Sequence, residues 1–169
     1  PGGWEMCKRD GRGLAGGVLF GSLGGGRSPA AAYTPIVGAD LRIAAGAAVT
    51  LPLTTEFEHA VLVIEGELTV AGTATAPGPL LYLGSDRDEL TLSSESGAHA
   101  VLIGGEPFGE DLVMWWNFVG RSHDEIDAAR TDWENHDTGR FGDIAGHSPQ
   151  QRIPAPPLPN LRLKPRKRR

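Results

Sequence analysis

Short apolar or alternating runs, each ended within a few residues by Gly, Pro, Asp or Ser, fill the chain from position 18 to position 103. Many short strands at regular spacing, with no helix between them, are typical of an antiparallel sandwich or barrel. The 24 glycines and 13 prolines agree with many turns between short elements. We therefore predict an all-β body with strands at 18–20, 40–43, 47–53, 60–64, 67–70, 80–83, 89–92 and 99–103, and one more at 112–118.

The run AVLVIEGELTVAG, at 60–72, is the clearest strand signal, because its apolar residues alternate on both faces before Gly66 interrupts them. Small barrels either hold a ligand or are filled by their own side chains. A filled interior is favoured by the bulky residues available to point inward: Leu51, Leu53, Leu62, Ile64, Leu81, Leu83 and Leu102. A small-ligand binder that uses the barrel mouth remains a third possibility for function.

One helix is predicted, at 122–135. Ser122 is a good N-cap, and Glu125 completes a capping box in which the hydroxyl and the carboxylate each bond a free backbone N–H. Apolar residues then recur at spacings of three and four, which gives the helix a single apolar stripe. The stripe consists of Ile126, Ala129 and Trp133.

Trp115 and Trp116 stand side by side just ahead of this helix, in VMWWNFVGRSHDEI. The pair could line a binding site or could serve packing. In a strand at 112–118 the two side chains would point to opposite faces. We expect one Trp in the barrel or its wall and the other beneath the helix, near Trp133.

The two ends differ from the body. Residues 1–17 have no periodicity and are predicted to be a flexible leader. The proline-rich segment that ends at residue 160 is predicted to be an extended strap, either lying across the barrel or loose, and Ile153, Leu158 and Leu161 favour lying across. The basic tail, 161–169, could contact nucleic acid or act as an import signal, but a solvated end is the commoner case.

Length and composition limit the classes of protein. A chain of 169 residues fits one domain, 18–160, with tails. A single cysteine, Cys7, excludes an internal disulfide framework, and no apolar run is long enough to cross a bilayer, so we expect a soluble, cytoplasmic protein. Six of the 16 basic residues lie in the tail, leaving ten against 21 acids in the body, which makes the body a poor surface for nucleic acid.

No catalytic motif is found. The serines at 28, 85 and 122 have no His and acid partners at a recognisable spacing, and GSLGGGRSP has the register neither of a dinucleotide-binding loop nor of a P-loop. His99 opens a strand, His123 lies in the first helical turn, and His136 and His147 lie in loops more than a helical turn apart. We therefore predict no catalytic, cofactor-binding or metal-binding residue.

The segments GEPFGEDLVMWWNFVGRSHDEIDAARTDW, GRFGDI and RIPAPPLP occur together and in order, and they resemble the C-terminal half of bacterial pirin-family proteins. GGGRSPAAAYTPIVGADLRIAAGAAVTLPL resembles the start of that half. The resemblance implies a bicupin, whose N-terminal barrel holds iron through three histidines and a glutamate. It also implies quercetin 2,3-dioxygenase activity or a role as a redox-responsive transcriptional cofactor.

The sequence departs from the family at the metal ligands, because no His-x-His occurs in it. When the cupin pattern is laid from Gly46, the histidine positions fall at Pro52 and Thr54, and the glutamate position at Glu58 or His59. The second cupin motif would need a histidine shortly after Gly78, and none is there. His59 alone, which we expect to be partly exposed at a strand start, is a poor basis for a site, since a metal needs several converging ligands.

These observations give a cupin-type antiparallel barrel with one C-terminal helix and a Pro-rich tail. The first hypothesis for function is a metal-free C-terminal cupin that supports the metal-binding N-terminal cupin of a pirin-like protein, with no cofactor and no activity of its own. The alternative is a stand-alone, non-catalytic module that binds another protein through an exposed apolar surface. The partner is then a metal-bearing cupin or another protein, and no membrane is involved.

Overall fold

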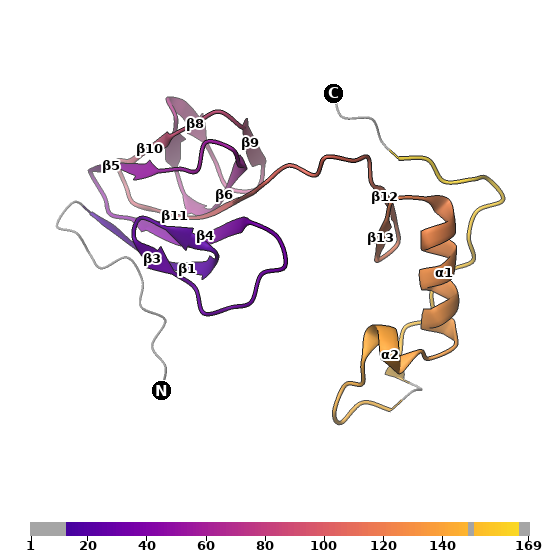
Figure 1. Cartoon of the computed structure of the whole chain (residues 1–169). Helices are drawn as coiled ribbons and strands as arrows, with labels where there is room; N and C mark the ends of the chain where they lie inside the picture. Colours follow the sequence, from indigo (N-terminus) through magenta and orange to yellow (C-terminus); the bar gives the residue numbers. More distant parts are fainter. Residues whose placement is uncertain (1–12, 149–150, 166–169) are drawn as a thin grey trace. The chain divides into compact units, whose positions relative to one another are not determined.

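The computed structural model describes residues 13–148 and 151–165. The chain divides into two compact units, Pro1–Pro107 and Phe108–Arg169, whose elements are labelled in Figure 1. Each unit has its own cluster of buried apolar side chains. Among the described residues, no helix has the length and apolar character that a membrane crossing needs.

The first unit consists of antiparallel sheets. The larger sheet has the order β1-β4-β11-β6-β9. Its strands are β1 (Leu14–Phe20), β4 (Ile36–Ile43), β6 (Glu58–Gly66), β9 (Leu80–Gly84) and β11 (Ala98–Gly105). The second sheet has the order β5-β10-β7-β8. Its strands are β5 (Ala47–Pro52), β7 (Leu68–Val70), β8 (Thr73–Thr75) and β10 (Glu89–Ser94), and a separate short pair is formed by β2 (Ser22–Leu23) and β3 (Gly26–Arg27).

The predicted strands of the first unit are all present, with small shifts at their ends. β1 begins at Leu14, four residues before the expected start, so the expected leader overlaps it at 14–17. Residues 1–12 of that leader lie outside the described residues. Three other short strands, β2, β3 and β8, have only two or three residues each and were not predicted.

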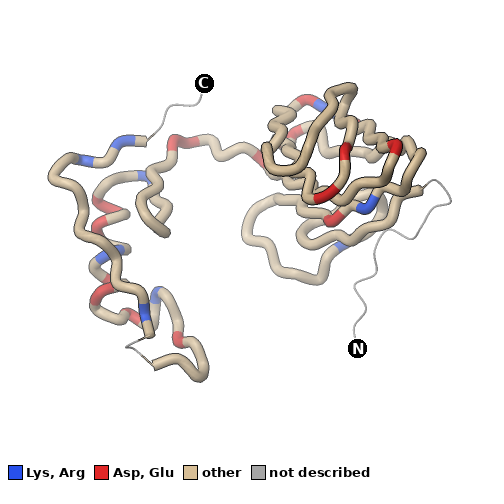
Figure 2. The backbone as a smooth tube through the Cα atoms, turned by 180° about the vertical axis from the view of Figure 1, so that it is seen from behind, with Lys and Arg blue, Asp and Glu red and all other residues tan. Residues whose placement is uncertain are grey.

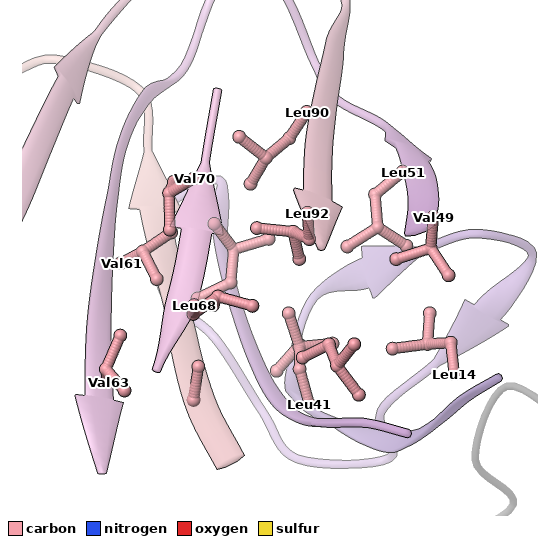
Figure 3. Close-up of a cluster of buried hydrophobic side chains, with 14 residues drawn as sticks. Leu14, Leu41, Val49, Leu51, Val61, Val63, Leu68, Val70, Leu90 and Leu92 are labelled. Carbon is pink, nitrogen blue, oxygen red and sulfur yellow. The ribbon is translucent and has the colours of Figure 1, made fainter. Parts of the chain in front are cut away.

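Side chains from both sheets meet in one core (Figure 3). In β6 the inward residues are Val61 and Val63, which are almost fully buried, while Leu62 is half-buried and Ile64 is exposed. The prediction that Leu62 and Ile64 point inward is therefore wrong. Both alternating sets of this strand are apolar, so periodicity alone could not choose between them.

The rest of the interior agrees with the predicted filled barrel. Leu51 and Leu102 are buried, and Leu53, Leu81 and Leu83 pack against the same cluster. A residual cavity of about 10 Å³ lies between β1, β4 and β5, which is near the smallest volume that holds one water molecule.

The second unit contains a hairpin and two helices. These are β12 (Val113–Trp115), β13 (Phe118–Gly120), α1 (His123–Glu134) and the short α2 (Thr138–Phe141). The prediction of one continuous strand at 112–118 is wrong, because the chain reverses at Trp116 and Asn117, between the paired Trp115 and Phe118. α2 was not predicted.

Helix α1 starts as the capping box predicts. The Ser122 hydroxyl accepts the N–H of Glu125 at 3.2 Å, and the Glu125 carboxylate accepts the N–H of Arg121 at 2.8 Å. Its buried residues, Ile126 and Ala129, belong to the predicted stripe and pack with Val113 and Phe118 of the hairpin.

The proline-rich strap contacts helix α1 within its own unit, and the expected position across the barrel stays a prediction. Arg130 Nε donates to the carbonyl of Pro156 at 2.7 Å, and Ala155 N–H donates to the Glu134 carboxylate at 2.8 Å. Of the three residues expected to hold the strap down, Leu158 packs against the buried cluster of the second unit, whereas Ile153 and Leu161 are 70% and 78% exposed. The polar contacts match the charges that Figure 2 shows, with acidic and basic residues on helix α1 and basic residues alone on the segment 151–165.

Candidate functional site

His59 is buried in the barrel, with 2% of its surface exposed. The prediction of a partly exposed side chain is wrong, and the reason lies in the neighbouring strand. His59 pairs with Gly104 of β11, where an added Cβ would come within 2.7 Å of the imidazole Cδ2, so the absent side chain leaves room for the ring. Nδ1 of His59 has no hydrogen-bond partner.

Burial lowers the pKa of His59 below its ordinary value of 6.5, and a backbone hydrogen bond with Phe57 offsets this in part. The imidazole is therefore neutral at neutral pH. A neutral imidazole can bind a metal, but one ligand does not make a site.

The other positions of the cupin pattern do not supply the missing ligands. Pro52, at the end of β5, and Thr54 are exposed and offer no metal-binding atom of the required kind. Glu58 accepts a hydrogen bond from the Tyr82 hydroxyl at 2.9 Å. No group of three or more His, Cys, Asp or Glu side chains in residues 13–148 and 151–165 could hold an ion. The iron that the family resemblance implies therefore does not fit the described residues of this chain.

The remaining histidines have separate roles. His99 Nε2 lies 2.5 Å from an Asp40 carboxylate oxygen on the outer side of the large sheet. His123 Nδ1 accepts the N–H of Leu163 at 3.1 Å, so it helps to hold the start of the basic tail on helix α1. His136 and His147, which the sequence separates by eleven positions, line the same pocket in the second unit.

The serines considered as nucleophiles are used in the local structure. Ser28 Oγ donates to the carbonyl of Leu19 at 2.7 Å and accepts the N–H of Ala30. Ser85 Oγ donates to the carboxylate of its neighbour Asp86 at 3.3 Å, and Ser122 caps helix α1. None of these three contacts includes a histidine that could act as a general base.

The outer face of the five-stranded sheet is the first surface that suggests binding. Because strand residues alternate in direction, the register gives two neighbouring rows of outward residues that cross all five strands. From β1 to β9, the first row is Phe20, Gly38, Ile103, Ala60 and Tyr82. The second row is Gly17, Asp40, Val101, Leu62 and Leu80.

We call these two rows the apolar sheet face. Phe20 and Ile103 are each 44% exposed, Leu80 is 54% exposed and Tyr82 is 63% exposed. Polar contacts lie among these residues, since Asp40 of the second row pairs with His99 and Tyr82 of the first row donates to Glu58. Large exposed apolar side chains that gather on one face and are flanked by polar groups are characteristic of a binding interface.

A pocket of about 520 Å³ in the second unit is the other candidate. We call it the aromatic pocket. Its walls include the rings of Trp116, Phe118, Trp133 and Phe141, and Ile144 and Ile153 also line it. Both Trp115 and Trp116 pack against the cluster of this unit, whereas the sequence predicts one Trp in the barrel. The expected neighbourhood of Trp133 is confirmed for Trp116, whose ring centroid lies 6.0 Å from that of Trp133.

Comparison with known proteins identifies the family. The family model of the pirin C-terminal cupin domain matches residues 38–142. A Pseudomonas aeruginosa protein provisionally named quercetin 2,3-dioxygenase is 43% identical over 143 residues, which cover 84% of this chain and 44% of the relative. A pirin-like protein of Arabidopsis thaliana is 30% identical over 131 residues, 72% of this chain and 42% of the relative.

The structural comparison agrees with the sequence comparison. The crystal structure of quercetin 2,3-dioxygenase from Acinetobacter baumannii superposes with a TM-score of 0.80 at 33% identity, covering 95% of this chain and 53% of that one. The chain thus spans about half the length of the relatives that it matches. The predicted all-β cupin fold is confirmed, and the chain belongs to the pirin family through its C-terminal cupin domain.

Proposed function

We propose that this chain is a supporting cupin, which uses the apolar sheet face to bind a second, metal-bearing cupin. The apolar sheet face is the observation that carries the proposal. Phe20, Ile103, Leu80 and Tyr82 expose large apolar side chains on the first, third and fifth strands of the sheet, and covering them would remove apolar area from water at about 25 cal/mol per Å².

The share of the relatives that the chain covers supports the same proposal. The chain matches 44% of the Pseudomonas aeruginosa relative, so the remainder of that relative is a natural candidate for the second cupin. We propose that the remainder holds the iron and that the quercetin 2,3-dioxygenase activity named for the relatives belongs to the assembled pair. The supporting cupin then contributes a fixed surface and no metal ligand.

A binding experiment tests this proposal. The full chain is mixed with the separately produced, iron-loaded remainder of the Pseudomonas aeruginosa relative, and the affinity is measured by titration calorimetry. We expect a one-to-one complex, and we expect I103E and L80E each to weaken it by at least about tenfold, because each places an unpaired charge in the interface. The control is Y33E, which changes a fully exposed aromatic residue of the same unit that lies outside the apolar sheet face.

The opposite results would reject the proposal. A chain that keeps stoichiometric iron after purification and oxidises a flavonol by itself is an enzyme and not a supporting cupin. A complex that Y33E weakens as much as I103E does not use the apolar sheet face. If the remainder does not bind but I103E abolishes binding to another protein, the alternative of a stand-alone interaction module is favoured.

A further inference from the structure

The aromatic pocket lies in the second unit and plays no part in the function proposed for the sheet. We propose that it binds a flat, uncharged aromatic small molecule. Its volume of about 520 Å³ falls in the range of roughly 300–1,000 Å³ that small-molecule pockets occupy. Ligand pockets of this kind have mainly apolar and aromatic walls with a few polar groups.

The four aromatic rings of the pocket wall contact one another in sequence, and the last ring contacts the first. Centroid distances are 5.3 Å for Trp116–Phe118, 6.1 Å for Phe118–Phe141, 5.2 Å for Phe141–Trp133 and 6.0 Å for Trp133–Trp116. Three of these contacts are edge-to-face, an arrangement that favours contact between a ring edge and a ring face. Each ring is therefore held by two others, and a flat ligand would meet a surface that is already ordered.

Two residues of the wall have unusual backbone conformations. Trp116 has φ of +50° at the first central position of the β12–β13 turn, where a two-residue hairpin turn with this geometry normally has Gly. His136, with φ of +58°, is the left-handed residue that ends helix α1, where its N–H donates to the Trp133 carbonyl and the Asp137 N–H donates to the Asp132 carbonyl. Trp116 has no such capping role, so its bulky side chain in the left-handed region is strained, and such strain gathers at ligand sites. Local turn chemistry favours Gly at position 116, so the turn does not explain why a Trp is found there. A contact with a ligand would explain it.

Of the charged side chains that line the pocket, Asp137 and Arg152 already have partners, and the carboxylate of Asp143 disfavours an anion, so an uncharged ligand fits this lining best. The Asp137 carboxylate accepts the N–H of Gly139 at 2.9 Å and caps α2. Arg152 pairs with Glu134 at 3.3 Å, and its guanidinium stacks 5.2 Å from the Trp133 ring. A charged ligand would have to compete with these partners, whereas an uncharged ring only has to displace water.

The hydrogen-bonding edge of Trp133 is also occupied, since its indole N–H donates to the carbonyl of Ile153 at 2.9 Å. Trp133 therefore offers the pocket its ring and not its donor. Ile144 and Ile153, which are 68% and 70% exposed, add apolar contact area. Ring faces and methyl groups are the surfaces that an aromatic hydrocarbon framework covers best.

The test uses a fluorescent probe that matches this chemistry. The neutral dye N-phenyl-1-naphthylamine is titrated into the full chain, and both its emission and the quenching of tryptophan fluorescence are followed. We expect saturable one-to-one binding, and weaker binding of its sulfonated, anionic analogue. I153E and I144E should each lower the affinity by at least about tenfold, because each adds a charge to the apolar wall. Both positions are exposed, so folding should be kept, as circular dichroism will show.

Two controls locate the dye. L161E changes a residue of the same strap that is 78% exposed and does not line the pocket, and L80E changes the apolar sheet face. Neither should alter dye binding. The inference is overturned if the dye does not bind, if L161E or L80E weakens binding as much as I153E does, or if the anionic analogue binds more tightly. It is also overturned if I153E leaves dye binding intact but abolishes the binding of the second cupin, because the pocket would then be a protein-docking site.

Discussion

At the scale of single residues, His59 makes the stability of the barrel depend on pH. Burial lowers its folded-state pKa below the ordinary 6.5, so the unfolded chain binds a proton more readily than the folded chain. The contribution of His59 to the free energy of unfolding is therefore fully present above about pH 6.5, and it is lost as the pH drops below that value. We expect a lower urea midpoint at about pH 5 than at about pH 7.5, and H59M should show a smaller decrease between them.

The matched control is H147Q, which removes an exposed histidine of the second unit. Its urea midpoint should depend on pH as that of the parent chain does. A parent chain that is equally stable at both pH values would contradict the burial of a neutral His59. So would a pH dependence that H59M leaves unchanged.

His59 also shows what residue-level reasoning could not find. Its position at the start of a strand was predicted, but its burial depends on Gly104, which is 45 positions away along the chain and opposite it in β11. His136 and His147 are a similar case, because α2 and the following loop bring them to one pocket. Contacts set by tertiary pairing leave no periodic signal in the sequence.

At the scale of elements, sequence signals whose residues lie close together in the chain predicted secondary structure reliably. The helix was predicted from Ser122 and Glu125, and both capping bonds are present. The hairpin was missed because its turn has Trp116 and Asn117 at the centre, whereas the usual hairpin signal is Asn-Gly or Gly at the turn. A turn that breaks the local rule cannot be read from local composition, and here the exception coincides with the aromatic pocket.

The strap and helix α1 provide a test at the same scale. Glu134 accepts the N–H of Ala155 at 2.8 Å and pairs with Arg152, and these contacts lower the pKa of its carboxyl group. We expect E134A to speed amide hydrogen exchange at Ala155 by roughly tenfold, because the Ala155 N–H loses its hydrogen bond to a charged acceptor. D127A, which removes another exposed acid of the same helix, should leave this exchange rate unchanged. Equal exchange rates in E134A and the parent would show that Glu134 does not anchor the strap.

At the scale of the whole molecule, the fold class was predictable and its division into two units was not. Runs of short strands identify the barrel because each strand carries its own pattern. The second unit is held by an apolar cluster whose members come from separate elements, and pairs such as Arg162–Asp124, at 2.7 Å, also join residues far apart in the sequence. Charged pairs of this kind are too common on protein surfaces to predict which elements meet.

The buried apolar clusters of the barrel and of the second unit differ in size, which predicts that the two units differ in stability. In the described residues, the barrel cluster has 14 buried apolar residues and the cluster of the second unit has five. Because each large buried side chain contributes about 1.5–3 kcal/mol, the second unit should open at a lower free-energy cost than the barrel. Hydrogen exchange on the full chain at increasing urea should give opening free energies for the amides of Ile126 and Ala129 that lie at least about 2 kcal/mol below those for Val61 and Leu102. Identical opening free energies for the two sets would mean that the units unfold as one cooperative body, and the small cluster would then need stabilisation that its own buried side chains do not provide.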